Sequence, residues 1–176
     1  MLVAAACHGN RTEVMLRPAT TTLDKVWLLE ASGTPVSDTT VTFALATGRT
    51  IVLRHARPDD AIFAVLQFPA TKDSLRPRDS VHVSIHPMAG KYAFTMTTTD
   101  KLGIGAQATF SYAIHFRTPS DAFAKYPNPG RFEAQLAPAE LGADNKVQFL
   151  AGSRPAADMI RFPLTTSGSY ALAASR

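Results

Sequence analysis

The longest alternating stretch of the chain is Ala108-Thr109-Phe110-Ser111-Tyr112-Ala113-Ile114-His115-Phe116. Large apolar side chains stand at every second position, and smaller or polar residues fill the positions between them. Successive side chains of an extended strand point to opposite faces, so this rhythm is typical of a strand with one buried and one solvated face. The stretch therefore predicts a long antiparallel strand over 108–116.

The same two-residue rhythm recurs along most of the chain, and turn-forming residues separate the alternating segments. The remaining predicted strands are Val26–Glu30, Val41–Leu45, Thr50–Arg54, Ile62–Phe68, Val81–Ile85, Tyr92–Met96, Phe132–Leu136, Val147–Leu150, Met159–Pro163 and Tyr170–Ala173. Only Pro119–Tyr126 could form a helical turn, with Ser120 as its cap. This spacing of strands predicts an all-β fold, an antiparallel β-sandwich.

A weak internal repeat relates the two halves of the chain. The segment that begins His55-Ala56-Arg57-Pro58 has a counterpart that begins His115-Phe116-Arg117-Thr118-Pro119, and each half closes on a Gly-x-Tyr triplet, at Gly90 and at Gly168. These triplets resemble the closing strands of immunoglobulin-like sandwiches. The resemblance implies an immunoglobulin-like architecture, and the repeat implies two tandem modules, 23–99 and 100–176, that follow a tether-like segment, 1–22. A single fused domain and a chance repeat remain the alternatives.

The N-terminal residues Met1-Leu2-Val3-Ala4-Ala5-Ala6-Cys7 contain the only cysteine of the chain. Small residues directly before a cysteine resemble the signal of bacterial lipoproteins. That resemblance implies a lipid on Cys7, a membrane anchor, and a periplasmic or cell-envelope location. The charged start and most of the apolar segment of such signals are missing. The alternative is an apolar strand with a free buried thiol.

Composition narrows the possible partners. The 176 residues carry a net charge of +4, with 45% apolar and 18% charged residues, as in an ordinary globular protein. The basic residues are scattered and form no run, so we expect no nucleic-acid partner. No stretch reaches the roughly 18 consecutive apolar residues that a membrane-spanning helix needs.

Histidine and methionine suggest one metal hypothesis. His82 and His86 lie four residues apart on a predicted strand, a span of about 13 Å, which is too far for one ion. His86-Pro87-Met88 resembles the His-x-Met element of periplasmic copper chaperones, and a thioether suits Cu(I). The match is partial, because the upstream methionine of those proteins falls at Ala64. The alternative is a pair of solvent-facing histidines.

The two repeated segments suggest a binding surface. Two equivalent loops could present His55 and Arg57, together with His115 and Arg117, to a partner's carboxylate or to a lipid phosphate. The sequence favours a simpler interpretation, in which a strand ends in a proline turn and its arginine and aspartate are solvated. The same interpretation applies to Asp59, Asp60 and Asp121.

No catalytic signature is found in the sequence: there is no Gly-x-Ser-x-Gly, no His-Glu-x-x-His and no phosphate loop. We therefore expect a non-catalytic accessory subunit, without a cofactor, that docks on a larger membrane-associated complex. A respiratory or photosynthetic complex is one example, which no residue selects. Trp27 and Tyr126 are candidate interface anchors, and Trp27 could equally belong to the core. The alternative function is a periplasmic protein that binds copper or a small ligand.

Overall fold

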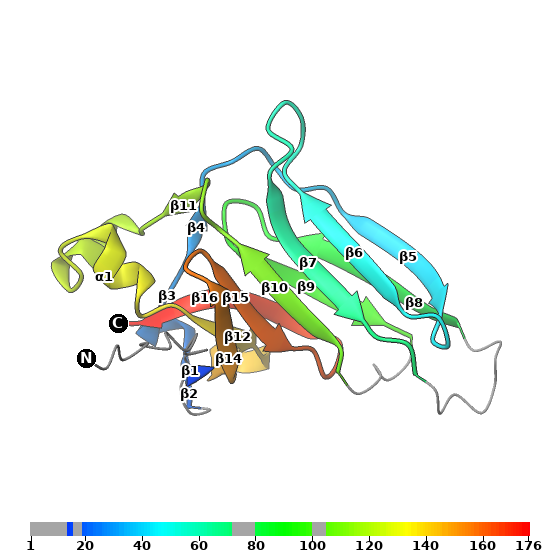
Figure 1. Ribbon diagram of the computed structural model, residues 1–176. Helices are drawn as coiled ribbons and strands as arrows, with labels where there is room; N and C mark the ends of the chain where they lie inside the picture. Colours follow the sequence, from blue (N-terminus) through cyan, green and yellow to red (C-terminus); the bar gives the residue numbers. More distant parts are fainter. Residues whose placement is uncertain (1–13, 16–18, 72–79, 100–104) are drawn as a thin grey trace, which may run out of the picture.

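The computed structural model describes residues 14–15, 19–71, 80–99 and 105–176 (Figure 1). Cys7 lies outside these residues, so its lipidation stays a prediction. Nearly all regular elements of the described chain are strands, and every strand pair is antiparallel. The predicted all-β, antiparallel class is therefore confirmed.

Two sheets contain most of the strands. The six-stranded sheet has the order β1 (Val14–Met15), β14 (Gly152–Ala156), β15 (Met159–Pro163), β10 (Gln107–Ser111), β7 (Ile62–Phe68) and β6 (Arg49–Arg54). The eight-stranded sheet has the order β2 (Thr20–Thr22), β13 (Lys146–Phe149), β12 (Ala137–Leu141), β16 (Gly168–Ser175), β9 (Ala93–Thr98), β8 (Ser80–Pro87) and β5 (Thr39–Ala44), and β3 (Val26–Leu28) also pairs with β16. A short ribbon of β4 (Glu30–Ala31) and β11 (Phe116–Arg117) lies at one end of the molecule (Figure 1).

A single large hydrophobic core joins the two sheets, and Phe110 lies at its centre. The Phe110 ring, on β10, packs at 5.4 Å from Phe94 of β9 in the other sheet and at 5.7 Å from Phe162 of β15. It also meets the edges of Phe63 and Tyr92 at 5.5 and 6.3 Å. Rings at these distances and tilts contribute more than their buried area alone. The strands with alternating apolar residues therefore turn their buried faces toward each other, and these faces form the interface between the two sheets.

Strands from both halves of the chain share both sheets. Strand β7 pairs with β10 in one sheet, with Leu66 opposite Ala108, and β9 pairs with β16 in the other, with Phe94 opposite Tyr170. The predicted modules 23–99 and 100–176 thus contribute to the same core. The internal duplication and its immunoglobulin-like character stay predictions.

The strand predicted over 108–116 is too long. Strand β10 ends at Ser111, residues 113–115 form a turn, and Ile114 is 74% exposed. The chain leaves the six-stranded sheet after Tyr112, whose hydroxyl donates to the Ala157 carbonyl at 2.9 Å, and then pairs with β4 as β11. The alternation in the sequence continues past Ser111, but the burial does not: Tyr112 is buried, Ile114 is exposed and Phe116 is partly buried.

The strand predicted over Phe132–Leu136 is wrong. Helix α1 (Pro129–Glu133) occupies this region, and Asn128 caps it by accepting the Arg131 amide at 2.9 Å. Phe132 and Leu136 are both fully buried, and a spacing of four residues places them on one face of a helical turn. Apolar residues at i and i+4 suit strand and helix alike, so the alternation could not decide between them.

Three 3₁₀ turns complete the described structure: η1 (Leu23–Lys25), η2 (Ser120–Ala124) and η3 (Ala143–Asn145). Turn η2 confirms the helical turn predicted after Pro119, but its N-cap is Pro119 and not Ser120. Strands β12 and β14 are not among the predicted strands, because each contains a proline and no alternating apolar run. Among the described residues, no helix has the length and apolar character needed to cross a membrane.

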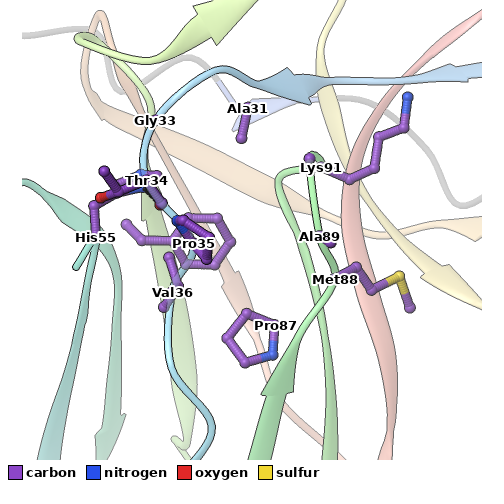
Figure 2. Close-up of a pocket in the computed structure, with 12 residues that line it drawn as sticks. Ala31, Gly33, Thr34, Pro35, Val36, His55, Pro87, Met88, Ala89 and Lys91 are labelled. Carbon is purple, nitrogen blue, oxygen red and sulfur yellow. Dashed lines mark hydrogen bonds between the residues drawn. The ribbon is translucent and has the colours of Figure 1, made fainter.

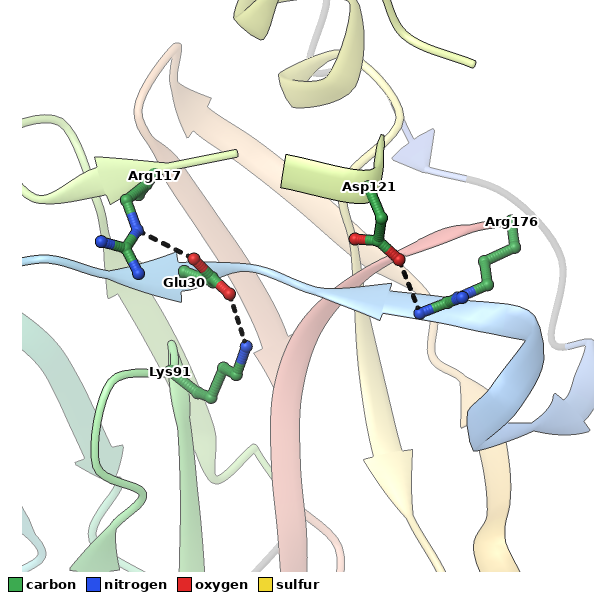
Figure 3. A network of polar contacts seen from close by, with 5 residues as sticks. All are labelled: Glu30, Lys91, Arg117, Asp121 and Arg176. Atoms are coloured by element: carbon green, nitrogen blue, oxygen red, sulfur yellow. Dashed lines mark hydrogen bonds and ion pairs between the residues drawn. The ribbon is translucent and has the colours of Figure 1, made fainter. Parts of the chain in front are cut away.

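The C-terminal residue Arg176 holds the helical region against β3. Its guanidinium contacts Asp121 of η2 at 3.0 Å (Figure 3) and lies over the Trp27 ring at 5.2 Å. Trp27 and Tyr126 meet edge to face at 5.7 Å, and both are buried inside this chain. These contacts make both rings part of the core, which leaves them little surface to anchor a partner.

Buried tyrosines give the fold a sensitivity to alkaline pH. Tyr92, Tyr112 and Tyr170 are each 1% exposed, and burial raises the pKa of all three, that of Tyr112 to about 12. The unfolded chain therefore loses these protons first, near pH 10, and stability should fall as pH rises from about 10 toward 12. Tyrosinate absorbance recorded with circular dichroism should show the three ionising only as the sheet signal is lost. Ionisation near pH 10 in a folded protein would contradict this expectation.

Candidate metal centre

The structure brings the two repeat-related histidines together. The rings of His55 and His115 lie 4.4 Å apart between centroids, although they come from opposite halves of the chain. Asp59 joins them, and its carboxylate oxygen Oδ2 lies 2.6 Å from His115 Nε2. One nitrogen of each ring and one carboxylate oxygen all lie within 4.8 Å of one another. These three side chains form the candidate centre.

The β6–β7 connection supplies two of the three side chains. His55 directly follows β6, and its backbone amide donates to the Ala61 carbonyl at 2.9 Å. The chain then turns tightly, with the Asp59 amide donating to the Ala56 carbonyl at 3.2 Å and Asp60 in the left-handed region at φ 56°. Aspartate tolerates this conformation well. The turn thereby returns the Asp59 carboxylate toward the His55 ring.

The third side chain comes from the turn between β10 and β11. The backbone carbonyl of His115 accepts hydrogen bonds from the Ser32 amide at 3.0 Å and from the Ser32 hydroxyl at 3.3 Å. This carbonyl is held by the segment that follows β4, so the position of His115 depends on contacts far away in sequence. A continuous strand over 108–116 would not have formed this turn.

The His55 ring is oriented by the backbone. His55 is 3% exposed, and its Nδ1 lies 2.6 Å from the Thr34 carbonyl oxygen. A carbonyl only accepts, so Nδ1 carries the proton and Nε2 of the neutral ring keeps its lone pair. Metal-binding histidines commonly donate one ring N–H to a carbonyl or carboxylate in this manner.

Among the described residues, no hydrogen bond to His55 Nε2 is found, whereas His115 Nε2 and Asp59 Oδ2, both buried atoms, lie 2.6 Å apart as an ion pair. The contact with His115 lowers the pKa of Asp59, against the opposing effect of its partial burial. Asp59 is therefore a carboxylate at neutral pH.

The donor set fits one metal ion. Ions such as Zn²⁺ hold imidazole nitrogens and carboxylate oxygens at about 2.0–2.2 Å, which places such atoms roughly 3–3.5 Å apart. The present separations extend from 2.6 Å to at most 4.8 Å, so small ring rotations would bring the three atoms onto one ion. The side chains of His115 and Asp59 keep 17% and 16% exposure, although His115 Nε2 and Asp59 Oδ2 are themselves buried.

Gly33 lies directly against the rings of His55 and His115. A Cβ atom at this position would lie 2.7 Å from His115 Cγ and 2.7 Å from His55 Nδ1, well inside the contact distance of real Cβ atoms. Only a residue without a side chain leaves both rings in place.

We expect Gly33→Ala to weaken metal binding by about 10- to 100-fold, the range for groups that orient ligands. The added methyl must displace at least one ring, and isothermal titration with Zn²⁺ would measure the effect. Gly130→Ala is the matched control, since its Cβ would meet nothing closer than 3.6 Å. Equal affinities of the two variants for Zn²⁺ would contradict the expected displacement of the histidine rings.

The two repeat-related arginines differ from the predicted equivalent pair. Arg57 is exposed, and no ion pair or hydrogen bond to it is found among the described residues. The Arg117 guanidinium instead lies 2.8 Å from Glu30, which also accepts from Lys91 at 3.0 Å (Figure 3). Burial would raise the pKa of Glu30, but the hydrogen bonds from Lys91 and Arg117 outweigh it and lower that pKa. Arg117 thus fastens the β4–β11 ribbon, and partner binding by these residues stays a prediction.

The predicted copper residues lie elsewhere. His86 is exposed and its Nδ1 lies 2.9 Å from Asp38 Oδ2, whereas Met88 lines a pocket on the wall opposite His55 (Figure 2). Sequence reasoning missed Asp59 as a ligand, because a carboxylate after a proline usually serves a turn. The available signal was the pair of matched histidines, with Asp59 four residues after the first.

Comparisons with protein-family models, with curated proteins and with solved structures found no match to this chain. The proposals below therefore rest on the geometry of the chain itself.

Proposed function

We propose that this protein binds one divalent transition-metal ion at His55, Asp59 and His115. The observation that carries the proposal is the convergence of two imidazoles and one carboxylate, each of which offers a ligand atom within 4.8 Å of the others. His55 Nε2 is also buried without a hydrogen-bond partner among the described residues. A buried polar atom without a partner costs about 1–3 kcal/mol, and more when charged. One bound ion would satisfy this nitrogen and bind the other two ligand atoms at once.

The donor atoms restrict the class of metal. Two imidazoles and one carboxylate suit Zn²⁺, Fe²⁺, Co²⁺, Ni²⁺ or Cu²⁺, whereas Cu⁺ prefers the sulfur ligands that this set lacks. Ca²⁺ and Mg²⁺ prefer sites made entirely of oxygen atoms. Three protein ligands would leave at least one coordination position for a further ligand such as water.

The centre would also join distant parts of the chain. Its ligands come from the β6–β7 turn and from the turn before β11, and Thr34 of the segment after β4 orients His55. An ion that binds only the folded chain stabilises it by mass action. We thus propose metal binding without assigning a reaction. Docking on a membrane-associated complex and lipid anchoring stay predictions on which this proposal does not depend.

A metal titration tests the proposal. Chelator-treated protein should take up one equivalent of Zn²⁺ or Co²⁺, measured by calorimetry and elemental analysis, and its melting temperature should rise. The double variant His86→Ala, Met88→Ala is the matched control and should bind the same one equivalent. Absence of stoichiometric binding, or its loss in that double variant, would overturn the assignment of the site.

A further inference from the structure

A small pocket lies at the same end of the sandwich, between the 32–37 segment and the turn that joins β8 to β9 (Figure 2). Its volume is about 130 Å³. The pocket adjoins the candidate metal centre and shares His55, Gly33 and Thr34 with it, whereas Asp59 and His115 do not line it. The lining side chains come mainly from apolar residues: Ala31, Pro35, Val36, Phe63, Pro87 and Met88.

The wall of the pocket is rigid on one side and adaptable on the other. Phe63 is 1% exposed, and its ring stacks on Tyr92 at 5.2 Å with an interplanar angle of 10°. The proline rings of Pro35 and Pro87 have little freedom to collapse inward. Met88, with its flexible thioether, stands on the facing side, and in this view the thioether extends away from His55 and Pro35 (Figure 2).

The polar side chains around the pocket are already engaged. Lys91 donates to Glu30 at 3.0 Å, and Thr34 Oγ1 donates to the Ala56 carbonyl at 2.7 Å. His55 Nδ1 donates to the Thr34 carbonyl at 2.6 Å. A charged ligand would therefore lose its hydration without finding a free counter-charge.

We infer that this pocket binds a small, neutral, apolar molecule, an aromatic ring or a short branched aliphatic group. Its volume is close to that of an engineered apolar cavity of about 150 Å³ that takes up benzene. The occupant is a free small molecule, because the space fits one ring and is walled by engaged polar groups. This inference uses residues other than Asp59 and His115 and does not rest on metal binding.

Benzene is the probe, and the Met88 methyl group is the reporter. In protein labelled with ¹³C-methyl methionine, benzene should shift the Met88 resonance saturably, and benzoate should not compete. Ala31→Leu should abolish the shift, because the longer side chain takes up space within the pocket. Ala156→Leu, which adds the same carbons at an exposed position of β14, is the matched control and should bind as the unaltered protein does.

Three outcomes would overturn the inference. They are the absence of a saturable shift, an equal shift in the Ala31→Leu variant when its circular dichroism is unchanged, and equal competition by benzoate. Binding of N-acetylphenylalanine amide without any binding of benzene would also overturn it, because the occupant would then be a side chain of a partner protein.

Discussion

Replacing His55 by alanine is expected to weaken Zn²⁺ binding by more than about 100-fold. Loss of a residue that only orients a ligand costs 10- to 100-fold, and loss of the ligand itself should exceed this. His55 is the most buried of the three side chains, so water replaces its nitrogen poorly. Competition with a chromophoric chelator would measure the affinity of the variant against that of the unaltered protein.

His82→Ala is the matched control for this measurement. His82 is exposed on the outer side of β8 and its Nδ1 lies 2.9 Å from Thr42 Oγ1, away from the proposed centre. Its removal should leave the affinity unchanged. Equal losses in the two variants would show that the ion binds exposed histidines nonspecifically, and unchanged affinity in His55→Ala would exclude His55 as a ligand.

Phe110→Ala is expected to lower the free energy of unfolding by about 3–5 kcal/mol, the usual range for removal of a buried phenylalanine. The ring is fully buried and packs against four other rings, two from strands of its own sheet and two from β9 and the residue directly before it in the other sheet. Its loss leaves a cavity that the rigid strands cannot close. Urea denaturation followed by circular dichroism would measure the change.

Phe123→Ala serves as the control for the Phe110 experiment. Phe123 lies on η2 and is 44% exposed, so its truncation should cost less than about 1 kcal/mol. Similar costs for the two variants would mean that the buried ring cluster does not dominate the stability of the sandwich.

Alternation alone carried the prediction of fold class. In Val81–Ile85 the apolar positions are the buried ones, and the same holds for the strands around Phe94 and Phe110. It failed where two structures bury the same residues, as at Phe132 and Leu136. It also failed at Tyr112, where the chain changes its pairing partner and the periodicity continues without a break.

Only part of the candidate centre could be predicted from the sequence. Matching of the two proline segments identified His55 and His115 as related positions, but their direct contact depends on the strands that hold them. Nothing local distinguishes Asp59 from Asp60, which follows it directly. Burial distinguishes them, since Asp59 is partly buried with its carboxylate 2.6 Å from His115, whereas Asp60 is exposed.

The sequence by itself determined that this chain forms antiparallel strands, because the two-residue period is a local property of an extended backbone. Only the tertiary structure decided which strands pair, where β10 ends, and that two distant turns bring His55, Asp59 and His115 together. Pairing and register depend on the burial of residues far apart in the chain, and this burial is defined only when the two sheets have packed.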